Sequence, residues 1–114
     1  MNTKPQIKDD ALFQLLKAGK IKDFNKRKAA GETCDLRNSD FRGFNLRDLD
    51  TGGLDFSNSY FHQTDLRGLD LRNVNLEGAS INGARIAGAY FPAELTADEI
   101  LLSLIHGTRM RYQK

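Results

Sequence analysis

The stretch NLRDLDTGGLDFSN, residues 45–58, decides the fold of this chain, because its large apolar residues recur every five positions except at one. Leu46 and Phe56 lie ten positions apart, and Thr51 stands midway between them, followed by two glycines. Either one repeat ends there, or a single repeat continues through a defective unit. Since the spacing is kept on both sides of Thr51, we predict a single repeat with no loop or chain reversal at 51–53.

The five-residue spacing extends over residues 34–93, which divide into twelve units without an insertion. Large apolar residues fill eleven of the twelve central positions, and Gly or Asn fills nine of the twelve fifth positions. A period of five fits neither a helix nor an ordinary strand. It predicts a short extended piece with one inward side chain, then a turn that needs positive φ. The predicted core consists of the central residues Leu36, Phe41, Leu46, Thr51, Phe56, Phe61, Leu66, Leu71, Leu76, Ile81, Ile86 and Phe91.

Each predicted unit rotates the chain by about a quarter turn, so four units close a square coil of twenty residues. Such coils stack about 4.8 Å apart through backbone hydrogen bonds and are stabilised by their neighbours. The sequence therefore predicts a mainly β chain, a parallel quadrilateral β-helix (a β-solenoid) of about three coils.

The units CDLRN, TDLRG, LDLRN and VNLEG resemble the pentapeptide-repeat family, whose units follow the pattern A-(D/N)-L-x-x. The resemblance implies a right-handed quadrilateral β-helix. Asp or Asn precedes the central residue in eight of the twelve units, and the late units depart most, so irregularity is expected near residues 80–93. The first position is small in the family but large at Leu49 and Leu54, which we predict fill the room that Thr51 leaves.

The flanking segments are predicted to cap a single domain of residues 1–114, with an N-terminal helical cap over 8–31 and a C-terminal helix over 96–107. Thr96 and Glu99 have capping-box spacing. Two interpretations of this helix stay open: a cap alone, or a cap that is also a homodimer contact, since some family members pair through that end. The candidate contact residues are Ile100, Leu101, Leu102, Leu104 and Ile105.

Composition gives no reason to expect nucleic acid or membrane as a partner, because 17 basic and 15 acidic residues leave a net charge of +2. Cys34 is the only cysteine, which rules out an intrachain disulfide and fits a reducing compartment. No window reaches the roughly 18 apolar residues of a membrane span, and charges interrupt the N-terminus. We predict a soluble, cytoplasmic protein.

Catalytic candidates are sparse. His62 and His106 are the only histidines, and Cys34 is the only thiol. No metal, nucleophile or phosphate motif occurs. The carboxylates recur with the repeat because side chains beside each turn accept backbone N–H bonds. We predict no enzyme, no catalytic residue, no metal and no cofactor.

Arginine is the strongest surface signal, since Arg37 and four further arginines occupy the fourth position of their units. Two interpretations stay open: a ladder neutralised by acids such as Asp48, Asp65 and Asp70, or a basic stripe that docks an acidic partner or phosphate. The partner-binding candidates are Arg42, Arg47, Arg67, Arg72 and His62.

The leading functional hypothesis is a non-enzymatic, rigid protein–protein interaction module whose protein partner the sequence does not identify. The alternative is nucleic-acid or phosphate binding through the arginine stripe and the basic segment KIKDFNKRK, residues 20–28. Some relatives protect topoisomerases by imitating DNA, but three coils rise about 14 Å, a length over which DNA carries roughly eight charges. Residues 34–93 carry six Arg and eight acids, a net of −2, so DNA mimicry is disfavoured.

Overall fold

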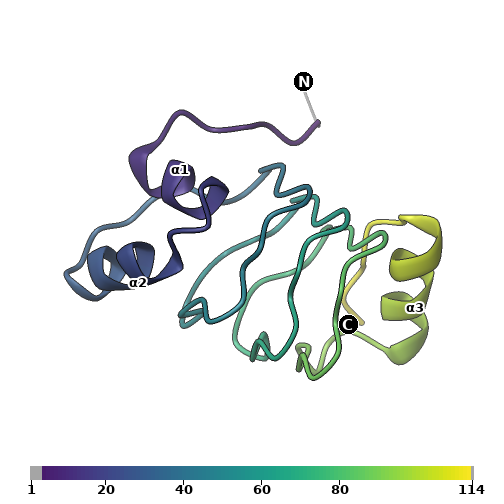
Figure 1. Ribbon diagram of the computed structural model, residues 1–114. Helices are drawn as coiled ribbons and strands as arrows, with labels where there is room; N and C mark the ends of the chain where they lie inside the picture. Colours follow the sequence, from purple (N-terminus) through teal and green to yellow (C-terminus); the bar gives the residue numbers. More distant parts are fainter. Residues whose placement is uncertain (1–3, 114) are drawn as a thin grey trace.

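A computed structural model describes residues 4–113 and contains three helices: α1 (Ala11–Lys17), α2 (Ile21–Ala29) and α3 (Ala97–His106). Figure 1 shows that the chain winds into stacked coils between α2 and α3, with α1 and α2 at one end and α3 at the other. We name residues 34–53, 54–73 and 74–93 the first, second and third coil. The ends of the predicted single domain, residues 1–3 and 114, lie outside the described residues.

The coils are joined by isolated parallel bridges, and residues 4–113 contain no continuous strand. Six bridges join residues twenty positions apart, such as Asp40 with Tyr60 and Tyr60 with Ser80. The expectation of a mainly β chain is therefore met only in part. The physical reason is that each extended piece is followed after a few residues by a turn, so no ladder grows beyond one bridge.

Turns between the units follow the predicted pattern at ten of the twelve fifth positions, which have positive φ. At the defective unit, the N–H of Leu54 donates to the carbonyl of Thr51 at 3.1 Å, and Gly53 has φ 72°. Irregularity was predicted near 80–93: it occurs at Ala93, which lacks positive φ, and not at Gly83 and Gly88, where glycine supports positive φ. The two fifth positions without positive φ are Asn73 and Ala93.

Aspartate and asparagine at the second position stabilise the turn that follows. In all eight units that carry one, its Oδ1 accepts the backbone N–H two residues later, as Asp65 does from Arg67 at 3.1 Å. Such side-chain bonds are the local reason for Asp and Asn in turns. The recurrence of carboxylates therefore has a structural cause.

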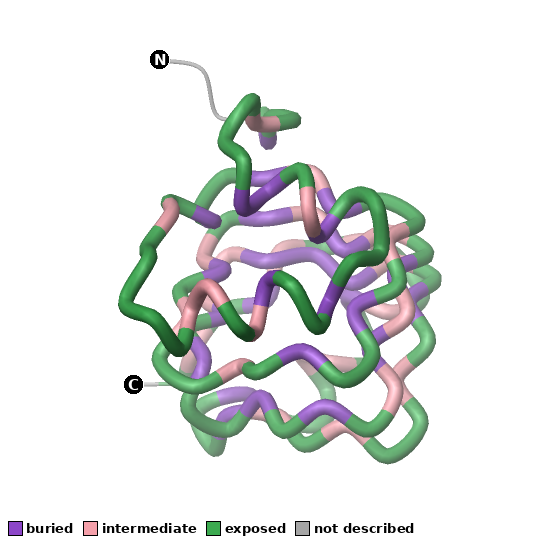
Figure 2. Tube along the Cα trace, turned by 60° about the vertical axis from the view of Figure 1, so that its left-hand side comes forward, coloured by how far each residue is buried: buried purple, intermediate pink, exposed green. Residues whose placement is uncertain are grey.

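Buried residues recur along the coils (Figure 2), and the core includes both central and first-position residues of the units. Nine of the twelve predicted core residues are buried, while Thr51, Ile86 and Phe91 are half-buried. Phe41 of the first coil stacks on Phe61 of the second, with ring centres 5.0 Å apart and planes 12° apart. Apart from Leu49 and Leu54, the prediction gave the core no first-position residues, and so it missed Ser39, Ser59, Thr64, Leu69, Val74, Ala79 and Ala84, which are buried.

Two helices and one extended segment cover the N-terminal end. Asp10 caps α1, because its Oδ1 accepts the N–H groups of Leu12 and Phe13 at 2.8 and 3.1 Å. The Phe13 ring packs 5.4 Å from the ring of Phe41, centre to centre. Gln6 forms a parallel bridge with Ser39, so an extended segment adds to the helical cap that the sequence predicted.

The C-terminal end is covered by α3 and by the chain that follows it. Thr96 is the N-cap of α3, accepting the N–H of Glu99 at 3.2 Å, and Gly107 ends the helix at φ 74°. Met110 is fully buried, donates its N–H to the carbonyl of Ala79 at 2.8 Å, and accepts from Gly78 at 2.7 Å. The sequence interpretation ended the C-terminal element at residue 107 and gave this returning segment no role.

Candidate interaction surfaces

Stacking between the first and second coils is interrupted on the walls that contain residues 34–36 and 49–53. Elsewhere, a second-position N–H donates to the first-position carbonyl one coil earlier, as Tyr60 does to Ser39 at 2.9 Å. The equivalent bond from Asp55 to Cys34 is absent among the described residues. On the next wall, the Thr51 hydroxyl donates to the carbonyl of Asp70 at 2.7 Å, where the backbone N–H would otherwise do so.

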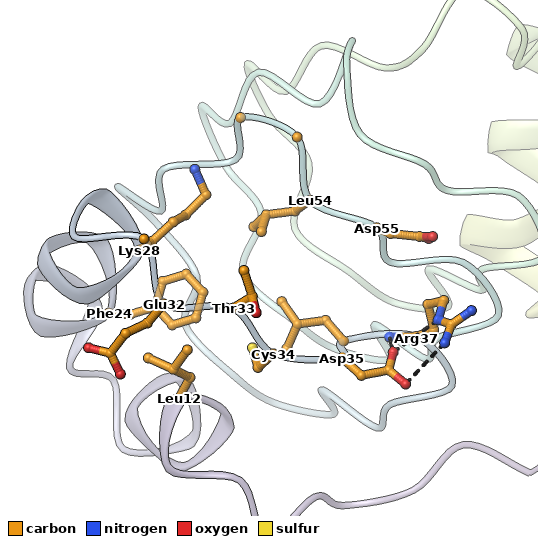
Figure 3. Close-up of a pocket in the computed structure, with 14 residues that line it drawn as sticks. Leu12, Phe24, Lys28, Glu32, Thr33, Cys34, Asp35, Arg37, Leu54 and Asp55 are labelled. Atoms are coloured by element: carbon orange, nitrogen blue, oxygen red, sulfur yellow. Dashed lines mark hydrogen bonds and ion pairs between the residues drawn. The ribbon is translucent and has the colours of Figure 1, made fainter.

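A cavity of about 520 Å³ opens where the stacking fails (Figure 3). Residues 33–37 form one side, residues 52–55 form the other, and Phe24 and Lys28 of α2 lie at the left-hand end in the view. Its apolar lining comes from Leu12, Phe24, Leu36 and Leu54. Leu49 is buried, whereas Leu54 is half-buried and lines the cavity, so Leu54 does not fill this region as predicted.

Helix α2 holds the last unit of the first coil through side-chain bonds. Asn25 donates to the carbonyl of Asp48 at 2.9 Å and accepts the N–H of Asp50 at 2.8 Å. The ammonium of Lys28 lies 3.3 Å from the Asp50 carboxylate. These contacts fix residues 48–50 to the helix, while Gly52 contributes no side chain that could close the cavity.

The cavity has an acidic character. Burial, followed by the negative charges of Asp10 and Asp35, raises the pKa of the Cys34 thiol to about 11. Asp35 is paired with Arg37 at 3.0 Å. Within residues 4–113, the Asp55 carboxylate has no ion pair within 4.0 Å.

Three of the five fourth-position arginines form bidentate ion pairs with the aspartate of their own unit. Arg67 Nε and Nη2 donate to the two oxygens of Asp65 at 3.0 and 2.8 Å. Arg72 binds Asp70 in the same way at 2.9 and 2.8 Å, which lowers the pKa of Asp70 to about 2. Arg37 and Asp35 form the third such pair. These guanidinium groups are neutralised where they stand.

Arg42 and Arg47 differ from the other arginines. Arg42 Nη2 lies 3.4 Å from Nδ1 of His62, and the other ring nitrogen of His62 lies 3.0 Å from Ser80 Oγ. Burial and then the charge of Arg42 lower the pKa of His62. The guanidinium of Arg47 has no ion pair within 4.0 Å among the described residues.

The predicted arginine stripe is distributed over separate walls. The bridges stack the unit of Arg42 on that of His62, and the unit of Arg47 on that of Arg67. Arg72 stands apart from both pairs, with its guanidinium 5.1 Å from the ring centre of Tyr90. The structure therefore brings together two pairs of candidates and no continuous basic surface of five.

Helix α3 exposes an apolar outer face. Leu101, Leu102 and Ile105 are 53%, 45% and 58% exposed, while the other two predicted contact residues, Ile100 and Leu104, are half-buried against the core. The helix side that faces the coils is marked by buried Ser103, whose Oγ accepts the N–H of Ile81 at 2.9 Å. Helical periodicity alone did not identify this side, because leucine and isoleucine occur all round the helix.

Two negative findings hold for the part of the chain that the structure describes. No three His, Cys, Asp or Glu side chains gather as a metal site would require. No helix is both long and apolar enough to cross a membrane.

Comparison with known proteins identifies the repeat. Residues 55–91 match the family model of pentapeptide repeats, with eight copies. No curated protein and no solved structure matches the chain. The match begins in the second coil, where regular stacking also begins. Residues 55–91 of this chain therefore consist of pentapeptide repeats.

Proposed function

We propose that this chain is a non-enzymatic interaction module, in which twelve units form a right-handed quadrilateral β-helix that pairs with a second copy through α3. The coil-to-coil bridges at a spacing of twenty residues support the β-helix. Its cytoplasmic location is part of the proposal and rests on the single unpaired cysteine.

The apolar outer face of α3 carries the proposal. Leu101, Leu102 and Ile105 are each about half exposed in the single chain. Burying one such side chain fully contributes about 1.5–3 kcal/mol. Three from each copy would meet at a two-fold interface, in which the same patch of both chains is self-complementary.

An antiparallel arrangement of two α3 helices, centred on Leu102, also matches charges. Residues whose numbers sum to 204 then face each other, so Asp98 lies opposite His106 of the second copy. The imidazole of His106 would donate a hydrogen bond to that carboxylate, and two such pairs would flank the apolar centre. This arrangement favours the antiparallel two-fold pair over a parallel pair, in which the aspartates would face each other.

Binding of a further protein would use the rigid walls of the coils, where side chains stand at fixed spacing. Nucleic-acid or phosphate binding through the arginines is the weaker alternative, because the guanidinium groups of Arg37, Arg67 and Arg72 are already paired with aspartate carboxylates. DNA mimicry is weaker still, since the same pairs leave those walls close to neutral.

Light scattering after size-exclusion chromatography tests the proposal. We expect a mass that rises with concentration toward twice 12.8 kDa for the natural chain. The triple variant Leu101→Gln, Leu102→Gln, Ile105→Gln should stay at 12.8 kDa with unchanged circular dichroism.

The matched control is Ile7→Gln, a change of a side chain that is 60% exposed at the other end of the molecule. It should dimerise like the natural chain. A natural chain that stays monomeric at every concentration would refute the pairing, as would a triple variant that still dimerises.

A further inference from the structure

We propose that the cavity between residues 33–37 and 52–55 binds an extended basic peptide, which pairs by its backbone with the free edge at Asp55. The cavity lies at the end of the molecule that carries α1 and α2, far along the chain from α3 (Figures 1 and 3). This binding is independent of the proposed pairing of α3.

Free backbone groups line both sides of the cavity. Regular stacking would join the N–H of Asp55 to the carbonyl of Cys34, and the N–H of Leu36 to the carbonyl of Asp55. In the described chain neither bond forms, and these four groups have no other hydrogen-bond partner. One coil further on, the N–H of Asn75 and the carbonyl of Leu54 are bonded at 3.3 Å, so the edge at 54–55 is paired on its far side only.

The dimensions suit a short strand. A volume of about 520 Å³ lies within the roughly 300–1,000 Å³ of ligand sites in proteins. In an extended peptide, alternate side chains point to the same side. One set would contact Leu36 and Leu54, which line the cavity, and the other set would face the polar rim.

Charge selects a basic peptide over an acidic or neutral one. Lys28, Glu32 and Arg37 at the rim each have an ion-pair partner within the molecule. Asp55 has none among residues 4–113 and lies beside the free backbone edge. Arg37 is paired with Asp35 and acts on Asp55 only at longer range, so a lysine of the peptide would supply a direct partner for Asp55. The carboxylates of Asp10 and Asp35 add to the negative charge near Cys34, and Lys8 offsets part of it.

The first coil already accepts an extended segment from outside the repeats. Gln6 donates its N–H to the carbonyl of Asn38 at 2.7 Å and accepts the N–H of Asp40 at 2.9 Å. Strand addition at an exposed edge is an established mode of peptide recognition. In the cavity, the backbone at residues 54–55 is a further edge of the same stack of coils, and residues 34–36 do not pair with it.

Titration with a defined peptide pool tests the proposal on the full chain. The probe is a pool of capped pentapeptides, acetyl-Lys-Φ-Lys-Φ-Lys-amide, in which Φ is Val, Leu, Ile or Phe. We expect saturable changes in the amide NMR signals of Leu36 and Asp55, together with slower hydrogen exchange at Asp55. The acidic pool with Glu in place of Lys should bind at least several-fold more weakly.

The variant Asp55→Asn removes the charge but keeps an oxygen for the N–H of Ser57, which Asp55 Oδ1 now accepts at 2.9 Å. It should weaken binding of the lysine pool several-fold. Asp40→Asn is the matched control, because Asp40 Oδ1 accepts the N–H of Arg42 in the same way outside the cavity. The α3 triple variant should bind the pool normally.

Four results would overturn the proposal: no saturable change up to about 1 mM peptide, binding that leaves the exchange of Asp55 unaltered, equal binding of the acidic pool, or equal weakening by Asp40→Asn.

Discussion

The two junctions between coils differ although the repeats that form them are alike. Between the second and third coils, Asp55 bridges to Asn75 and Asp70 bridges to Tyr90. At the equivalent places between the first and second coils, Asp35 and Asp55 form no bridge, nor do Asp50 and Asp70. The first unit, CDLRN, follows the repeat pattern as well as LDLRN does. Repeat identity therefore does not by itself guarantee stacking.

The difference follows from what each coil packs against. The first coil is bonded to α2 through Asn25 and Lys28, whereas the second coil lies between two coils of the same kind. A repeat unit at the end of a stack has one repeat neighbour only. The docking helix then sets its position on the other side, and a cavity is left.

The largest expected effect compares two leucines at the first position of second-coil units. Leu69 is 4% exposed at a wall where coils two and three are bridged, while Leu54 is half-buried and faces the cavity. We expect Leu69→Ala to lower the free energy of unfolding by about 2–4 kcal/mol and Leu54→Ala by about 1 kcal/mol. Urea denaturation of both variants measures this. Equal losses would show that the cavity is closed in solution.

The reactivity of Cys34, which lines the cavity between the first and second coils, tests the environment at this open junction. A pKa raised from 9.0 to about 11 lowers the thiolate fraction at pH 8 by roughly a hundredfold. Alkylation by iodoacetamide at that pH should therefore be slower than that of N-acetylcysteine by a similar factor, and should recover in guanidinium chloride. A native rate equal to that of the free thiol would contradict the acidic, partly buried setting.

The smallest expected effect compares two threonine hydroxyls. Thr64 Oγ1 is buried and donates to the carbonyl of Phe41 at 2.7 Å, while Thr51 Oγ1 donates to Asp70 at 2.7 Å beside the cavity. Thr64→Val should lower the free energy of unfolding by about 0.5–1.5 kcal/mol, since the carbonyl of Phe41 loses this bond and keeps the one from the N–H of Phe44 at 3.0 Å. Thr51→Val should cost about 0.5–1 kcal/mol, because water can replace its hydroxyl. A larger loss for Thr51 would mean that its bond holds the two coils together.

Much of the local structure followed from the sequence, and part of the surface did not. The five-residue spacing predicted the turns, and Asp and Asn at second positions predicted their side-chain bonds, because both are contacts within a few residues. The burial of Ser59 and Thr64 at first positions was missed, since their hydroxyls bond to carbonyls one coil away, as Ser59 does to Leu36 at 2.9 Å.

The candidate surfaces show the same limit. Fourth-position arginines were found from the sequence, but their pairing could not be assigned, because Arg67 turns to Asp65 whereas Arg42 turns to His62. Five apolar residues of α3 were found as one group. Only packing separated Ile100 and Leu104, which contact the core, from the three that are exposed.

By itself the sequence determined the repeat, its register through Thr51 and the residues that turn the chain, because these depend on local backbone preference and spacing. Tertiary structure alone decided where the coils separate, which arginines are neutralised and which face of α3 is open. Those features depend on how α2, α3 and the returning C-terminal segment dock on the coil edges. Docking joins residues far apart in the chain, and no five-residue pattern records it.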